Sequence, residues 1–317
     1  MARYLGSSLI CFVFAASPSA ADDFDQLKSL YNFDSSQPLE VHQSLLYERN
    51  GVNVYDLNYA SPKGGRVTAY LVAPADTQPH AGIVFGHWGS GTRTEFLPEA
   101  TLYARAGAVS LLVDNPWVRP APWRKPLKQL ENPDSDRDAF IQAVVDLRRG
   151  IDLLLTRPDV DAKKLAYVGH SFGAQWGAIL SAVDGRLQTC VLMGGVPDAE
   201  SIWRDGPDAG LVEYRANAPK DKQEAYLKAV SPTSAIHYVP HSKVPLLFQF
   251  ARYEQYFDQA AMTRYYEAAS QPKEVKWYDA GHDLNDLSAL SHRIKWLRGK
   301  VGLGPVESFL QATIEAK

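Results

Sequence analysis

The chain has 317 residues, of which 45% are hydrophobic and 22% are charged, and its formal net charge is -3. This composition is typical of a globular protein and excludes a bulk attraction to nucleic acid or to an anionic membrane. The length could hold two average domains, but a sheet with helices on both faces often uses this many residues as one unit. We therefore expect a single domain over residues 22–317 and no nucleic-acid partner.

Residues 1–21 have the pattern of a secretory signal peptide. One arginine precedes an apolar stretch from Leu9 to Ala16, and small residues lead to an expected cleavage near Ala20 or Ala21. A buried N-terminal helix is the alternative. The apolar stretch is too short for a membrane-spanning helix. We expect a secreted or periplasmic protein without a stable membrane anchor.

Cysteine usage fits this interpretation. The chain has two cysteines, and Cys11 would leave with the signal peptide. Cys190 then remains alone in an apolar segment, so we expect it to pack as a small hydrophobic residue. The fold cannot depend on an internal disulfide.

Short segments rich in β-forming residues recur along the chain. They cover residues 52–60, 66–74, 81–87, 108–114, 164–170, 189–195, 245–250 and 274–280. The first two are joined by a turn-forming Ser-Pro-Lys-Gly-Gly and read as an antiparallel pair. The later ones alternate with helical segments, of which 140–156 has the clearest apolar stripe. This order predicts a mostly parallel, doubly wound α/β sheet with an antiparallel start.

The segment Gly169-His170-Ser171-Phe172-Gly173 follows a predicted strand and opens a predicted helix. In such sheets, functional sites lie beyond the carboxyl ends of the strands. A G-x-S-x-G motif in this context is a nucleophile elbow, in which glycines permit a tight turn and the serine hydroxyl projects above the sheet. A tight structural turn is the alternative. We predict Ser171 as the nucleophile.

A serine nucleophile needs a base, and the chain order expected here is serine, acid, histidine. His282 follows the last predicted strand and a glycine that frees the turn. His237 and His241 precede a strand, and His292 lies within the terminal helical pattern. His282 is therefore the predicted base.

The acid that orients the base should lie a few residues beyond the preceding strand. Glu254 satisfies this spacing, and either carboxylate type can hold a histidine tautomer. Its rivals are Asp258, which we expect to cap the next helix, and Asp279 and Asp283, which flank the base. Glu254 is the predicted acid.

Oxyanion stabilisation should come from two backbone amides. One is that of Phe172, which follows the nucleophile. The other should lie in the glycine-containing loop after residues 81–85, where the donor is Trp88 or Gly89. A plain glycine turn is the alternative for this loop. We expect His87 to brace it.

Together these motifs resemble the α/β-hydrolase superfamily, most closely its dienelactone hydrolase-like and acetyl xylan esterase-like branches. The segments that carry the resemblance are IVFGHWGSG, KLAYVGHSFGA, VPLLFQFARYEQYF and YDAGHDLND, within residues 50 to 303. The resemblance implies the α/β-hydrolase fold and a serine esterase. Three departures are Glu254 where aspartate is more usual, Ala251 where glycine is common, and Gly-His-Trp-Gly in the oxyanion loop. A serine nucleophile disfavours dienelactone hydrolase activity itself, because those enzymes use cysteine.

The expected reaction is hydrolysis of a small-molecule carboxylic ester through an acyl-enzyme. We expect no metal or other cofactor, because no histidine or cysteine pair has ligand spacing. A serine peptidase of the same superfamily and a non-enzymatic binding protein are the alternatives. The oligomeric state is left open.

Two loop segments are candidates for shaping the pocket. Residues 115–126 supply either a substrate rim or a proline-stiffened surface loop with solvated cations, through Trp117, Arg119, Trp123, Arg124 and Lys125. Residues 197–228 could form a short lid, or helices with no gating role.

Overall fold

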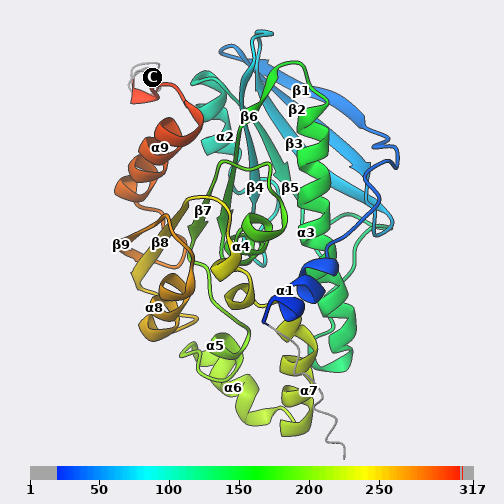
Figure 1. The fold of residues 1–317 in the computed structure, drawn as a ribbon, viewed down its shortest axis with the longest axis vertical. Coiled ribbons are helices and arrows are strands. Elements are labelled where there is room, and N and C mark those ends of the chain that lie inside the picture. The colour runs from blue at the N-terminus through cyan, green and yellow to red at the C-terminus, as the bar shows by residue number, and fades with distance from the viewer. Residues whose placement is uncertain (1–19, 308, 310–317) are drawn as a thin grey trace, which may run out of the picture.

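The computed structural model describes residues 20–307 and residue 309 (Figure 1). Within this part, nine strands form one sheet in the order β1-β2-β3-β5-β4-β6-β7-β8-β9. The strands are β1 (His42–Arg49), β2 (Val52–Ala60), β3 (Arg66–Pro74), β4 (His80–Gly86), β5 (Ala108–Val113), β6 (Val160–His170), β7 (Thr189–Met193), β8 (Leu246–Tyr253) and β9 (Lys273–Gly281). Residues 1–19 of the predicted signal peptide lie outside the described part.

The sheet changes character along its width. Strands β1, β2, β3 and β5 pair antiparallel in that order, and β5, β4, β6, β7, β8 and β9 pair parallel. The predicted fold class is therefore confirmed, including the antiparallel start. The sequence did not indicate β1, because all eight of its residues are exposed and it lacks the alternation of a half-buried strand.

Helices cover both faces of the sheet. They are α1 (Ala20–Ser29), α2 (Leu97–Arg105), α3 (Pro133–Leu155), α4 (Phe172–Val183), α5 (Glu200–Trp203), α6 (Ala209–Asn217), α7 (Lys220–Val230), α8 (Gln259–Ala268) and α9 (Leu287–Val301), with 3-10 turns at Gln129–Glu131, Ser231–Thr233, Ala235–His237 and Val239–His241. Side chains of α3, α4, α7 and α8 share one buried cluster, and those of α2 and α9 share the other. No helix in residues 20–307 or at 309 is both long and apolar enough to cross a bilayer.

The central strands supply both clusters because their side chains alternate between faces. In β4, Val84 belongs to the cluster under α3 and α4, whereas Ile83 and Phe85 belong to the one under α2 and α9. Helix α3 begins earlier than the apolar stripe predicts, because the Asn132 side chain accepts a hydrogen bond from Ser135 N and Pro133 occupies the first turn.

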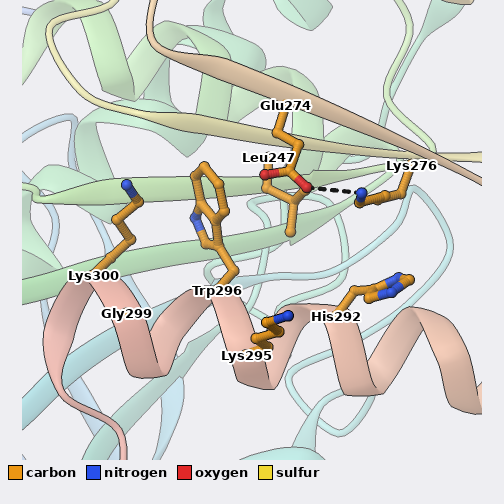
Figure 2. A pocket seen from close by; sticks show the side chains of 8 residues that line it. All are labelled: Leu247, Glu274, Lys276, His292, Lys295, Trp296, Gly299 and Lys300. Carbon is orange, nitrogen blue, oxygen red and sulfur yellow. Dashed lines mark ion pairs between the residues drawn. The ribbon is translucent and has the colours of Figure 1, made fainter.

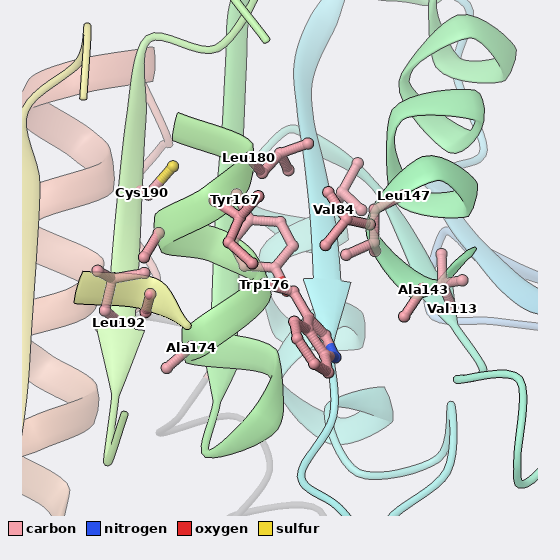
Figure 3. Packing of buried hydrophobic residues seen from close by; sticks show 14 of the residues in the cluster. Val84, Val113, Ala143, Leu147, Tyr167, Ala174, Trp176, Leu180, Cys190 and Leu192 are labelled. Carbon is pink, nitrogen blue, oxygen red and sulfur yellow. The ribbon is translucent and has the colours of Figure 1, made fainter. Parts of the chain in front are cut away.

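Packing around α4 fixes the position of the elbow that precedes it (Figure 3). Tyr167 of β6 is fully buried, and its hydroxyl donates to the carbonyl of Gly173 at 2.8 Å. Cys190 of the neighbouring β7 is also fully buried, as predicted, and burial raises the pKa of its thiol. The first turn of α4 is therefore tied to the sheet at the carboxyl end of β6.

Candidate active site

Ser171 lies between β6 and α4 with φ 55° and ψ -112°. A positive φ in a non-glycine residue costs on the order of 1–3 kcal/mol, and such strain clusters at functional sites. A Cβ on Gly169 would lie 2.3 Å from the carbonyl oxygen of Gly173, and one on Gly173 would lie 2.0 Å from that of Gly86. Both glycines are required by close backbone contact, and Ser171 is held in a strained turn.

Glu254 and His282 are brought together by the ends of adjacent parallel strands. Oε2 of Glu254 lies 2.7 Å from Nδ1 of His282, with only 2% and 4% of the side chains exposed. The other carboxylate oxygen accepts the backbone N–H groups of Gln255 and Tyr256, at 2.9 and 3.0 Å. Because Glu254 is held at both oxygens, it fixes the orientation of the histidine ring.

The other predicted acids have different roles. Asp258 caps α8 by accepting from Ala261 N at 2.7 Å, as expected. Asp279 pairs with Arg252 at 3.1 Å, with both side chains largely exposed, and Asp283 is exposed.

The other histidines after the elbow are likewise engaged elsewhere or exposed. His241 stacks on Phe24, and His292 contacts the hydroxyl of Tyr278. His237 is exposed. Only His282 among these lies in the same cavity as Ser171 within the described residues.

Ser171 and His282 line a cavity of about 330 Å³. The rest of the wall comes from the predicted oxyanion loop after β4, the start of α4, the segment after β8, and the region of α5 and α6. Its residues are Trp88, Gly89, Ser90, Phe172, Ile202, Asp208, Gly210, Leu211, Tyr256 and Phe257. No hydrogen bond joins Ser171 to His282 in the described conformation; such bonds are often long before substrate binds. Because Ser171 and His282 line the same cavity, one bound ligand can contact both side chains.

The two predicted donors in the loop after β4, Trp88 N and Gly89 N, differ in whether they already donate a hydrogen bond. Trp88 N donates to Oε2 of Glu95 at 2.8 Å. Among the described residues, the N–H groups of Gly89 and Phe172 have no acceptor, and both residues line the cavity. Of the three predicted oxyanion donors, the amides of Gly89 and Phe172 are therefore free and that of Trp88 is engaged.

His87 braces this loop, as predicted. Its Nε2 accepts the N–H of Asn115 at 2.9 Å, so its Nδ1–H donates to the Trp88 carbonyl at 2.6 Å. Burial lowers the pKa of His87. A neutral imidazole is the form that this donor and acceptor arrangement requires.

The interpretation of residues 115–126 as a substrate rim is wrong for this structure, since none of its five candidates lines the cavity with Ser171. Arg119 is 1% exposed and pairs with the fully buried Asp146 of α3 at 2.7 Å, so it is not a solvated cation either. Trp117 donates its indole N–H to the Gly89 carbonyl at 2.7 Å and contacts the Phe172 ring. This segment supports the oxyanion loop from behind.

A second cavity of about 330 Å³ lies between β9 and α9 (Figure 2). Three lysines line it, and one of them, Lys276, pairs with Glu274 at 3.0 Å. It holds none of the predicted catalytic groups. Across the described part of the chain, no cluster of three or more His, Cys, Asp or Glu could hold a metal.

The strand order and the elbow define the class of this protein by its architecture, which is the α/β-hydrolase fold. Residues 14–116, about a third of the chain, match the family model for acetyl xylan esterase (AXE1), a family of carboxylic-ester hydrolases. The predicted resemblance and the predicted enzyme class, an esterase, are thereby confirmed. No curated protein matches the sequence significantly.

Solved structures share the fold at low sequence identity. An acetyl xylan esterase from Paenibacillus sp. R4 is 22% identical, with a TM-score of 0.70 over 88% of this chain and 93% of that one. Acetyl xylan esterase 1 from Thermoanaerobacterium sp. JW/SL YS485 is 17% identical, with a TM-score of 0.70 over 86% and 92%. An esterase from Pyrococcus furiosus is 16% identical, with a TM-score of 0.57 over 78% and 92%. These structures support the architecture.

Proposed function

We propose that this esterase uses a Ser171-Glu254-His282 triad and an acyl-enzyme intermediate. The observation that carries the proposal is the 2.7 Å contact between buried Glu254 and Nδ1 of His282, the residue that shares a cavity with Ser171. Because the carboxylate accepts from Nδ1–H, Nε2 of the ring is left free to take a proton.

The reaction follows from these positions. His282 takes the proton of Ser171 as its Oγ attacks the ester carbonyl, and then gives that proton to the leaving alcohol. Water adds to the acyl-enzyme with His282 again as the base, and the acid is released. Glu254 stays ionised and stabilises the imidazolium that forms in each half.

The oxyanion is assigned to the amides of Phe172 and Gly89. Phe172 N is at the start of α4, where the positive end of the helix adds to the stabilisation. Of the two loop donors predicted, Trp88 already donates to Glu95, whereas Gly89 N has no other acceptor in the described chain. Gly89 is therefore the proposed second donor.

The cavity favours short, neutral esters. Its volume is about 330 Å³, and a drug-sized ligand site spans roughly 300–1,000 Å³, so this one is at the small end. The wall is mostly apolar, and Asp208 adds a carboxylate that disfavours anionic acyl groups. Since two of the similar structures are acetyl xylan esterases, acetyl esters of carbohydrates are the proposed substrates.

The segment 197–228 is proposed to act as a lid over this cavity. Ile202 of α5, Leu211 of α6 and Asp208, which caps α6, line the cavity, and α5, α6 and α7 lie together at the lower end of Figure 1. The proposed location of the enzyme is outside the cytoplasm, secreted or periplasmic, which rests on the signal-peptide pattern of residues 1–21.

The test uses purified residues 22–317 beside Ser171→Ala. Substrates are p-nitrophenyl esters from acetate to decanoate, acetylated xylo-oligosaccharide and aminoacyl p-nitroanilides. The expected result is ester turnover that falls with acyl length and vanishes in Ser171→Ala. Preferential cleavage of the anilides would establish a peptidase instead, and Ser171→Ala activity equal to the wild type would refute the triad.

A further inference from the structure

Glu95, in the loop between β4 and α2, contacts two parts of the site at once. Its Oε2 accepts Trp88 N–H at 2.8 Å, and its Oε1 lies 2.6 Å from Nδ1 of His170. His170 immediately precedes Ser171 and is 2% exposed, while the Glu95 side chain is 20% exposed. One carboxylate thus joins the oxyanion loop to the nucleophile elbow.

His170 continues this connection to the base. Its Nε2 lies 2.9 Å from the backbone oxygen of His282, and the centroids of the two rings are 5.0 Å apart. A chain of hydrogen bonds therefore runs from Trp88 through Glu95 and His170 to the backbone of His282. None of these contacts is part of the triad itself.

The donors and acceptors in this chain fix its proton count. A backbone carbonyl only accepts, so Nε2 of His170 must carry a proton. An ionised carboxylate also only accepts, so the contact between Nδ1 and Oε1 needs a second proton. A neutral His170 beside an ionised Glu95 has one proton for these two contacts. The observed geometry requires one more, which corresponds to an imidazolium–carboxylate pair.

We propose that Glu95 and His170 are positioning residues whose shared proton keeps the oxyanion loop and the base aligned with Ser171. This inference rests on the proposed esterase function. Loss of the shared proton leaves one proton to serve the carboxylate, and a lone pair on Nε2 then faces the His282 carbonyl. Two acceptors at that distance repel, and the backbone that carries the base is displaced.

Other ionisable groups surround the pair and enter any pH profile. Near the site these groups are His87 of the loop after β4, Tyr167 of β6, and the pair of Glu254 and His282. Glu95 also lines a groove between α2 and α9, where the other ionisable groups are Glu99, Arg105, Asp286 and Arg293. In the described structure, the His170 ring makes hydrogen bonds only to Glu95 and to the His282 carbonyl. Removing the negative charge of Glu95 therefore changes the hydrogen bonds of His170 directly and the surrounding groups, such as His87, only through charge.

Glu95→Gln is the diagnostic variant. The amide oxygen can accept Trp88 N–H, and the amide nitrogen can donate to Nδ1 of a neutral His170, which leaves Nε2–H for the carbonyl of His282. All three hydrogen bonds then persist without a titrating proton. We expect kcat within about threefold of wild type at pH 7, and a smaller alkaline decline in kcat than the one we expect for the wild type.

Two further variants complete the kinetic test. Glu95→Ala removes both contacts and should lower kcat about 10–100-fold with little change in KM. Glu48→Gln, at an exposed position of β1, should keep the wild-type profile. A wild-type enzyme without an alkaline decline, or a Glu95→Gln profile equal to that of wild type, contradicts the proposal.

A second measurement needs no turnover. In ¹⁵N-histidine-labelled Ser171→Ala protein at pH 7, both ring nitrogens of His170, assigned by their absence in His170→Asn, should be protonated. Adding Glu95→Gln should leave one of them unprotonated. A singly protonated His170 with Glu95 intact overturns the inference even if ester turnover is high. If the wild-type enzyme shows no ester turnover while His170 is doubly protonated, the proposed function is overturned instead.

Discussion

Glu254 and His282 meet at 2.7 Å although 28 positions separate them in the sequence. Parallel pairing of β8 with β9 places both residues just beyond the same edge of the sheet. The first prediction concerns this pair. Glu254→Ala should lower kcat about 10³–10⁴-fold with a small change in KM, because the imidazolium formed in each step loses its partner and its orientation.

Steady-state kinetics with p-nitrophenyl acetate measures this effect. Asp283→Ala is the matched control, since that carboxylate is exposed beside the base and makes no contact with it in the described structure. Its kcat should stay within about twofold of wild type. Equal losses in the two variants would show that Glu254 is not the orienting acid.

The second prediction concerns the support of the oxyanion loop. Trp117→Phe keeps an aromatic ring against Phe172 but removes the indole N–H that donates to the Gly89 carbonyl at 2.7 Å. Loss of one hydrogen bond to the loop should lower kcat about tenfold and cost roughly 1 kcal/mol of stability. A normal kcat with lowered stability would show that Trp117 contributes to packing and not to the position of the oxyanion loop. Parallel kinetics and urea unfolding separate the two outcomes.

The third prediction concerns the buried pair of Arg119 and Asp146. Arg119→Met leaves the Asp146 carboxylate buried with the hydroxyl of Ser61 as a side-chain partner. Removing one member of a buried pair costs about 3–5 kcal/mol. The double variant Arg119→Met, Asp146→Asn should recover part of this loss, and KM of the folded enzyme should not change. Urea unfolding gives the free energies of unfolding of the single and double variants. A change of KM in Arg119→Met without a loss of stability would instead support a substrate-rim role for residues 115–126.

Much of this architecture could be predicted because its signals are local. Short apolar segments bounded by turns mark the parallel strands, and the spacing of Gly169, Ser171 and Gly173 reflects backbone contacts that no larger residue permits. His282 and Glu254 could be proposed because the end of a strand is recognisable in sequence. The contact between Glu254 and His282 then follows from strand order.

The contacts that escaped prediction are those between polar groups distant in sequence. Arg119 looks like a surface cation until α3 places Asp146 beneath it, and an aspartate inside an apolar helix was the available signal. Glu95 has no motif, because its role depends on how one loop folds back onto Trp88 and His170. Spacing in the sequence does not encode such loop geometry.

The last prediction concerns acid stability and Asp184, at the end of α4. Burial alone would raise the pKa of this carboxyl, but hydrogen bonds and charge from Arg186, with a smaller contribution from Arg148, hold it below the usual value. A group whose pKa is lower in the folded state stabilises the protein above its unfolded-state pKa, and this stabilisation is lost as pH falls through the folded-state pKa. Asp184→Asn lacks this contribution. The difference in unfolding free energy between wild type and variant should therefore be constant near neutrality and shrink below about pH 4. Urea unfolding between pH 7 and pH 3 tests this, with exposed Asp25→Asn as the control for a carboxylate outside the core. A difference that grows on acidification would show that Asp184 is not stabilised as an anion.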